Sequence, residues 1–258
     1  HDGIMVLPQN LRVGDDFSSA YGYKFVSVDI DITPNRPDAF SYQGVARDIS
    51  SFKDIPLKKI KVNKRKPLST KKFQISIEDP TDCPRYIAGV IDNIKVEKSP
   101  RWITERLKAS GLRSINNIVD ISNLVMLEMG HPSHIFDYES LNINEIHIRR
   151  SKNGETFKTL DDNTHKLKIE NLLITDGQKP IALAGLMGGA NSSINSKTKS
   201  VLVECAYFNP ITIRKSSKVL GLSTDASKRF ERGADPNACE YAFWRIVNLI
   251  EKYANGTL

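Results

Sequence analysis

The chain has 258 residues, of which 40% are hydrophobic and 26% charged, as in an ordinary globular protein. No apolar run approaches the roughly 18–20 residues that span a bilayer, and no basic-then-apolar leader is found, so we expect neither membrane insertion nor secretion. The formal charge of +7 and the pI near 9.2 mildly favour a polyanionic partner.

The three cysteines, Cys83, Cys205 and Cys239, are far apart in the sequence and form no CxxC pair. This spacing argues against a zinc ribbon and a disulfide framework, and it fits a reducing, cytoplasmic setting. The chain opens on His1 instead of Met, and we expect it to be a piece of a longer protein.

We predict a small α/β unit for residues 1–55. Apolar and polar side chains alternate over residues 26–32, which predicts a half-buried strand. The TPNRP turn follows, and Asp38 is expected to cap a helix that continues through Ile49.

We predict a basic linker for residues 56–72. From Lys53 to Lys72 nine side chains are basic, whereas Asp54 is the single acid. A solvated, extended connector is the simpler interpretation of such a charge run, and a strip that contacts phosphates is the alternative.

Residues 73–258 predict a larger α+β domain of mixed short strands with flanking helices. A strand within residues 83–96 precedes a helix that begins at Ser99–Pro100 and ends at Gly111, and a last helix is expected over residues 235–253. Between them, short apolar runs separated by Gly and Asn turns predict strands at 145–150, 155–160, 165–170, 171–176, 180–193 and 200–208.

The segment 111–137 predicts a helix of unusual polarity. One face is apolar, whereas Asn116, Asp120 and Asn123 follow each other at i, i+4 and i+7 on the other. Gly130 is expected to end this helix. Short amides and carboxylates suit a wall that hydrogen-bonds a ligand, and the alternative is that they bond neighbouring loops.

Glu204 is the first candidate for chemistry, because it interrupts the apolar run VLVECAYF. A carboxylate is costly to bury unless a partner pairs with it. Either Glu204 therefore has a function, or strand alternation points it outward, or a basic side chain neutralises it.

The glycine-rich segment LAGLMGGANSS is the second candidate. Gly185, Gly188 and Gly189 allow a ligand to approach the backbone closely. No GK[ST] follows and GxGxxG is absent, so this is neither a P-loop nor a dinucleotide site. A tight turn between strands is the alternative.

His131, His134 and Asp137 form the third candidate. Their spacing of i, i+3 and i+6 could gather a metal, as in a metal-dependent hydrolase. However, Pro132 interrupts the helix that would align the two imidazoles, and we expect no metal site. The sequence also contains no GxSxG nucleophile elbow.

Four segments occur in the order found in one protein family: GLRSINNIVDISNLVMLEMGHPSHIFD, ALAGLMGG, VLVECAYFNP and LGLSTDASKRFERGADP. They resemble the editing module of the β-subunit of bacterial-type phenylalanyl-tRNA synthetases. TPNRPDAFSYQGVARDI is similar to the end of that subunit's N-terminal globular domain, and DGIMVLP resembles the tail of its tRNA-binding OB-like insertion. The resemblance covers nearly the whole chain and is weakest in the basic linker.

The resemblance implies hydrolytic proofreading of tyrosine misattached to the phenylalanine tRNA, with water attacking the aminoacyl ester. A pocket made for phenylalanine discriminates poorly against an analogue with one added hydroxyl, so a second site is needed. A buried polar group there would select tyrosine, because phenylalanine would leave that group unpaired at about 1–3 kcal/mol. The competing hypothesis is a non-catalytic module that holds the tRNA or the α-subunit.

The resemblance also implies the site residues. Glu204 and His134 are the catalytic candidates: Glu204 reads the phenol, and His134 positions or activates the water or holds the terminal ribose. Ser122 stands where the family commonly has Thr, and His131 where it often has Gln. The implied substrate-binding residues are Arg113, Ser122, Asn123, Gly185, Gly188, Thr224 and Ala226.

The implied partners are the phenylalanine tRNA and the α-subunit of an α2β2 enzyme. Lys218, Lys228 and Arg229 are the candidates for tRNA contact, because they lie near Thr224 and Ala226 in the sequence. ATP and Mg are expected at the synthetic site of the α-subunit. We expect no cofactor in this chain and no amino-acid activation by it alone.

Overall fold

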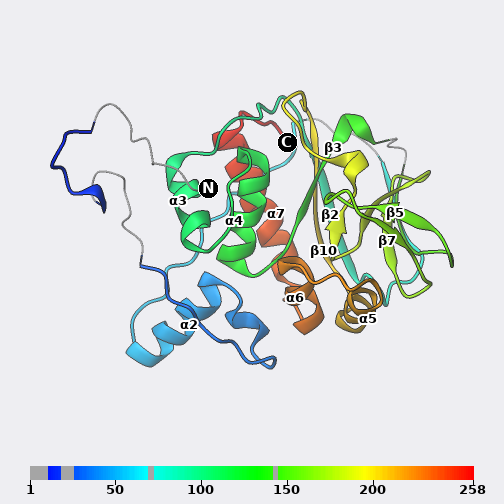
Figure 1. Ribbon diagram of the computed structural model, residues 1–258, viewed down its shortest axis with the longest axis horizontal. Helices are drawn as coiled ribbons and strands as arrows, with labels where there is room; N and C mark the ends of the chain where they lie inside the picture. Colours follow the sequence, from blue (N-terminus) through cyan, green and yellow to red (C-terminus); the bar gives the residue numbers. More distant parts are fainter. Residues whose placement is uncertain (1–10, 19–25, 69–72, 142–144) are drawn as a thin grey trace.

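The computed structural model describes residues 11–18, 26–68, 73–141 and 145–258. Its body has three layers (Figure 1): helices α3, α4 and α7, a three-stranded sheet, and a five-stranded sheet. This mixture confirms the predicted α+β class. The helices are α2 Tyr42–Lys53, α3 Arg101–Ala109, α4 Asn117–Met129, α5 Pro210–Leu220, α6 Asp225–Arg232 and α7 Ala238–Tyr253, with short 3-10 turns η1 Pro37–Ala39, η2 Tyr138–Ser140 and η3 Ala190–Ser192.

The three-stranded sheet has the order β2–β10–β3 and is antiparallel. The five-stranded sheet has the order β1–β4–β7–β8–β9, in which β1 and β4 are parallel and the other pairs antiparallel. Strands β5 and β6 form a separate hairpin. The strands are β1 Gln74–Ile77, β2 Arg85–Ile91, β3 His134–Asp137, β4 Glu145–Arg150, β5 Thr156–Lys158, β6 Thr164–Lys166, β7 Leu172–Thr175, β8 Pro180–Leu183, β9 Met187–Gly188 and β10 Val201–Tyr207.

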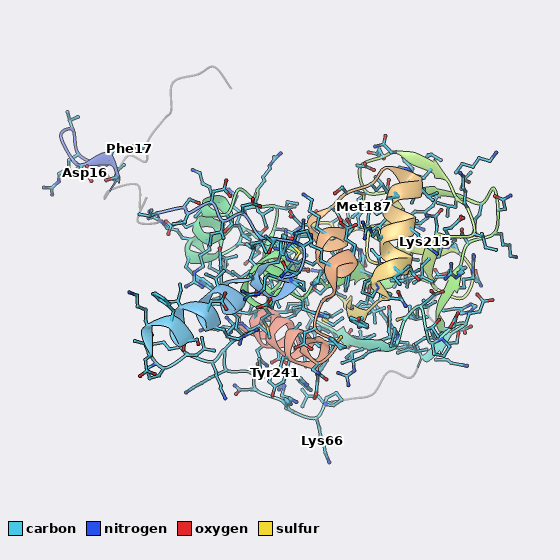
Figure 2. The ribbon with its side chains drawn as sticks, turned by 90° about the horizontal axis from the view of Figure 1, so that it is seen from below. Asp16, Phe17, Lys66, Met187, Lys215 and Tyr241 are labelled. Atoms are coloured by element: carbon cyan, nitrogen blue, oxygen red, sulfur yellow. The ribbon has the colours of Figure 1, made fainter. Side chains whose placement is uncertain are left out.

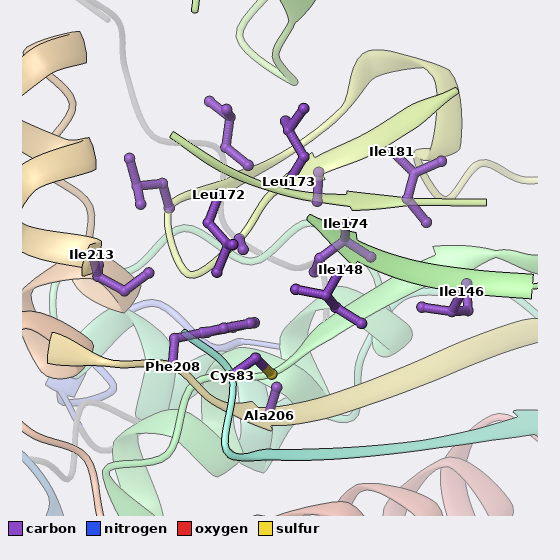
Figure 3. Close-up of a cluster of buried hydrophobic side chains, with 14 of the residues drawn as sticks. Cys83, Ile146, Ile148, Leu172, Leu173, Ile174, Ile181, Ala206, Phe208 and Ile213 are labelled. Atoms are coloured by element: carbon purple, nitrogen blue, oxygen red, sulfur yellow. The ribbon is translucent and has the colours of Figure 1, made fainter. Parts of the chain in front are cut away.

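Two apolar cores cover the two faces of the β2–β10–β3 sheet. Because side chains alternate along a strand, Val203 and Cys205 of β10 pack toward α3, α4 and α7, whereas Leu202 and Ala206 pack toward the five-stranded sheet. Figure 3 shows this second core, with Ala206 facing the isoleucines and leucines of the opposite sheet. Glu204 lies on the same face of β10 as Leu202 and Ala206, between the two sheets.

Polar side chains fix the start of α4. Asn116 is the N-cap residue, and its side chain accepts two backbone N–H groups of the first turn at 3.0 and 3.1 Å. Asp120 is fully buried and accepts hydrogen bonds from the hydroxyls of Ser99 and Ser114. Gly130 ends the helix in the left-handed conformation, as predicted. The Asn116 side chain therefore caps the helix, and Asp120 ties neighbouring segments to it.

The predicted strand over residues 26–32 is wrong. This segment has no regular structure, and Val26, Val28 and Ile30 are 90%, 74% and 49% exposed. No strand in the described part of the chain pairs with it. Alternation produces a strand only where a neighbour supplies hydrogen bonds and covers the apolar face.

The helix predicted after the TPNRP turn is present as α2, but its cap differs from the prediction. The Ser41 hydroxyl accepts the Gly44 N–H at 2.9 Å and caps the helix. Asp38 lies instead in η1, where Arg36 binds its carboxylate at 2.9 Å. The hydrogen bond from the Arg36 guanidinium lowers the pKa of Asp38. The same bond holds the aspartate in the turn.

The basic segment up to Leu68 contains no helix or strand, and it lies along α7, where its charge is partly neutralised. The backbone of Asn63 exchanges two hydrogen bonds with the amide of Asn248, at 2.7 and 3.0 Å. Lys64 pairs with Glu240 at 2.8 Å, and Arg65 pairs with Glu251. The segment is thus held by α7 instead of extending freely into solvent.

Residues 1–10, which carry DGIMVLP, lie outside the described residues. The division of the chain into units at 1–55, 56–72 and 73–258 stays a prediction. In the described ranges, no helix is both long and apolar enough to cross a membrane.

Candidate functional site

Two adjoining chambers lie between α4, the β8–β9 hairpin and the start of α6. The inner chamber has a volume of about 50 Å³, and Glu204, Phe208 and Phe230 belong to its wall. The outer chamber has a volume of about 490 Å³ and is bordered by Asn123 of α4 and Thr224 before α6. The chambers share several lining residues: Pro132, Ser133, His134, Leu186, Met187, Gly188 and Ala226.

Glu204 is buried in the wall of the inner chamber. Its side chain is 4% exposed, and its Oε2 atom has no hydrogen-bond partner among the described residues. Desolvation raises the pKa of Glu204 to about 8. The outward orientation and the neutralising basic partner considered from the sequence are therefore both wrong.

His134 lies directly opposite Glu204 in the register of β3 and β10. Antiparallel partners project from the same face of the sheet, and both side chains line the inner chamber. The His134 ring packs against the Phe136 ring, with centroids 4.4 Å apart. Burial lowers the pKa of His134 to about 4, so its imidazole is neutral at physiological pH.

Gly185 and Gly188 leave room for neighbours that a side chain would displace. A Cβ at Gly188 would lie 2.3 Å from Cε1 of His134. Gly185 has φ +69°, and a Cβ there would lie 2.8 Å from Cδ1 of Ile213. Both glycines line the inner chamber, so their small size is needed to form it.

Ser122, Asn123, Thr224 and Ala226 line the outer chamber. The Ser122 hydroxyl lies 2.9 Å from the hydroxyl of Ser133 and thereby ties α4 to the segment before β3. Thr224 is the N-cap of α6, where it accepts the Ser227 N–H, and its hydroxyl donates to the Leu186 carbonyl at 3.0 Å. The structure thus brings these four predicted residues together with Glu204 and His134.

Arg113 is exposed and lines neither chamber, although its neighbours Leu112 and Ile115 border the outer one. The structure places Arg113 at the rim of the site and not in its wall. A pocket-wall role for this arginine is therefore not supported by its position.

The three candidates for tRNA contact differ in exposure. Lys218 of α5 and Lys228 of α6 are exposed. Arg229 is 7% exposed, and its guanidinium donates to the carbonyls of Phe40 and Asp225 at 3.2 and 2.8 Å. The prediction that Arg229 contacts tRNA is therefore wrong for this structure, because the side chain is used to hold α6 against the Phe40 segment.

The metal-binding alternative fails on geometry. His134 and Asp137 lie three residues apart on β3, so they point to opposite faces. The Asp137 carboxylate accepts the Thr198 hydroxyl at 2.7 Å, and His131 is fully buried beside the Phe230 ring. Across the described ranges, no three His, Cys, Asp or Glu side chains are close enough to hold a metal ion.

Several wall residues were not found from the sequence. Met187 lines both chambers, Leu160 borders the outer one, and Phe208 and Phe230 close the inner one. Apolar wall residues have the same pattern as core residues, so no local signal distinguishes them.

Comparison with known proteins places this geometry in a family. A family model described as the B3/4 domain matches residues 82–255, which include every residue of both chambers. The chain belongs to the B3/4 domain family.

The B3/4 segment also lies within a longer region of similarity. The chain is 45% identical over 258 residues to the phenylalanine–tRNA ligase β-subunit of Syntrophus aciditrophicus, and 42% identical over 255 residues to that of Thermotoga maritima. Each match covers 99% of this chain and 32% of the relative. The chain thus spans about a third of the length of these curated relatives, and the family resemblance found in the sequence is confirmed.

Proposed function

We propose that this chain is the proofreading part of a phenylalanine–tRNA ligase β-subunit and hydrolyses tyrosine from the phenylalanine tRNA. The tyrosine side chain enters the inner chamber, while the ester and the terminal ribose occupy the outer one. The proposal is supported by the sizes of the chambers, since the small chamber that contains Glu204 adjoins a much wider one.

The observation that carries the proposal is the unpaired Oε2 atom of Glu204 in the wall of the inner chamber, which Phe208 and Phe230 also line. A phenol can donate to a carboxylate, and its oxygen can also accept from a protonated carboxyl group. Because its pKa in the empty site is about 8, Glu204 is mostly protonated at neutral pH. The tyrosine hydroxyl can form a hydrogen bond with either the protonated or the ionised carboxyl group. Phenylalanine can neither donate nor accept this hydrogen bond. It would leave the Glu204 carboxyl group without a partner, at a cost of about 1–3 kcal/mol.

His134 is suited to orienting the attacking water or the ribose. A general base works best when its pKa lies near the working pH, whereas burial lowers the pKa of His134 to about 4. Its neutral ring offers one donor and one acceptor next to Gly188, where the two chambers meet. The role supported here is therefore positioning of the water or ribose, with little proton abstraction by the imidazole.

The tRNA would reach the outer chamber along α5 and α6, where Lys218 and Lys228 are exposed. Their charges suit phosphates of the acceptor end. In the complete enzyme the α-subunit would carry ATP, Mg and the synthetic site, and this chain would need no cofactor for hydrolysis.

The proposal is tested with the full α/β enzyme and tyrosyl-tRNA for phenylalanine. Glu204→Ala is expected to slow the release of tyrosine at least tenfold, which corresponds to about 1.4 kcal/mol of lost stabilisation. Glu97→Ala is the matched control, because Glu97 is exposed and lies outside both chambers. Equal release by wild type and Glu204→Ala would contradict the role of Glu204. No release by the wild type would favour a non-catalytic module.

A further inference from the structure

The inner chamber is too small for the ring that the proposed function places in it. Its volume is about 50 Å³, whereas an apolar cavity of about 150 Å³ is the size that admits benzene. The outer chamber, at about 490 Å³, is large enough. An aromatic side chain that reaches Glu204 must therefore widen the passage between the chambers.

Most residues that line this passage are fixed. Gly188 and Ala226 have no side chain that could rotate away, and Pro132 is constrained by its ring. Ser133 is held by Ser122, whose hydroxyl lies 2.9 Å from the Ser133 hydroxyl and donates to its carbonyl at 3.1 Å. Movement of these residues would require a shift of the backbone.

His134 and Leu186 are also held in place. The His134 ring lies against Gly188 on one side and packs on Phe136, with centroids 4.4 Å apart, on another. Leu186 is 4% exposed, and its carbonyl accepts the Thr224 hydroxyl at 3.0 Å. Rotation of either side chain would break packing that holds the site together.

Met187 is the exception among these residues. It lies on β9 opposite Leu183 and is partly exposed at the junction of the chambers; Figure 2 shows it beside α6. Methionine is unbranched, has three rotatable side-chain bonds and adapts to irregular space at low cost. It can therefore leave the passage without any change in the backbone.

We infer that Met187 is the gate of the inner chamber and a determinant of its size selection. Its side chain closes the passage in the empty site and turns aside when an aromatic side chain enters. The closed gate keeps the chamber dry around Glu204, and the open gate sets the largest ring that passes. This inference rests on the proposed function of the site.

Met187→Ile tests whether the gate must move. Isoleucine is similarly apolar, but its branched Cβ is stiff at χ1, so the passage would stay obstructed. We expect kcat/KM for tyrosine release by the full α/β enzyme to fall at least tenfold. Met129→Ile is the matched control: Met129 lies near the end of α4 outside both chambers, and its rate should stay within twofold of wild type.

Met187→Ala tests size selection, and here the expected change is a gain in the release of a larger substrate. The passage would stay open, so rings larger than that of tyrosine should reach the inner chamber. Release of the bulkier 3-iodotyrosine, measured relative to tyrosine on the same tRNA, should rise at least fivefold. This variant also decides the matter if circular dichroism shows that Met187→Ile does not fold.

The outcomes separate the inference from the function on which it rests. Wild-type rates for Met187→Ile, or an unchanged ratio of 3-iodotyrosine to tyrosine release for Met187→Ala, would overturn the gate while leaving the proofreading function intact. If the wild-type enzyme releases no tyrosine at all, the proposed function fails and the gate fails with it.

Discussion

Glu204 and His134 are direct cross-strand partners of β10 and β3, and both side chains line the inner chamber. Burial acts on them in opposite directions: it raises the pKa of the carboxyl to about 8 and lowers the pKa of the imidazole to about 4. Between these values the empty pair is neutral. This neutrality lets a carboxyl group and an imidazole lie in an apolar wall without a compensating ion pair.

The first prediction concerns the stability cost of Glu204. Its folded-state pKa of about 8 lies above the ordinary 4.5, so the folded state holds the proton more tightly and its contribution to stability is lost as the pH rises toward 8. The free energy of unfolding should fall by about 2 kcal/mol between pH 6.5 and 8.5 because of this group. In Glu204→Gln, measured by urea denaturation, that part of the decrease should be absent. An identical pH dependence in both proteins would contradict the shifted pKa.

The second prediction concerns the pH dependence of hydrolysis. Because the pKa of His134 is about 4, the imidazole does not titrate between pH 5.5 and 7.5. We expect kcat for tyrosine release to show no step centred near 6.5 in that range. A bell or step near pH 6.5 that disappears in His134→Asn would instead assign general-base catalysis to His134.

The third prediction separates the two roles of glycine at the inner chamber. Gly185 and Gly221 have similar φ angles, +69° and +65°, so alanine suffers similar backbone strain at both. A Cβ at Gly221 meets no atom within 4 Å, whereas at Gly185 it meets Ile213 at 2.8 Å. Gly185→Ala should therefore cost about 1–3 kcal/mol more than Gly221→Ala in denaturant unfolding. Equal losses would mean that the chamber wall can yield.

The fourth prediction concerns the basic side chains near α6. Reversing the charges of the exposed Lys218 and Lys228 to Glu should weaken tRNA-dependent hydrolysis and flatten its dependence on salt, because fewer counterions are released. Arg229→Met should instead lower the melting temperature with an unchanged salt slope, since Arg229 binds carbonyls of the protein. A change of the salt slope in Arg229→Met alone would reverse these assignments.

Local signals predicted the elements of the domain well where tertiary contacts agreed with them. The strand expected at 145–150 is β4, and Gly130 ends α4 as expected. The Asn209–Pro210 pair is a typical helix start, with the Asn209 side chain accepting the first N–H groups of α5. That signal is present in the sequence, yet neither α5 nor α6 is among the predicted elements.

Other features depended on contacts that no local pattern reveals. Residues 26–32 alternate like a strand but pair with no strand in the described part of the chain. Arg229 resembles any surface arginine until the Phe40 carbonyl is known to lie beside it. In the candidate site, too, a local sequence signal reveals some residues and not others. Glu204 stood out because a charge in an apolar strand is costly, whereas Met187 did not, because an apolar residue in a hairpin is ordinary.

The claim that Glu204 selects tyrosine is tested most directly by a ratio of two hydrolysis rates in the full α/β enzyme. These are the rates for the tyrosyl and the phenylalanyl esters of the phenylalanine tRNA. The wild type should favour the tyrosyl ester by about tenfold or more, as expected from one buried polar group satisfied or left unpaired. Glu204→Leu should remove this preference, because an apolar chamber end accepts phenylalanine at least as well. A tyrosine preference that survives in Glu204→Leu would contradict the account.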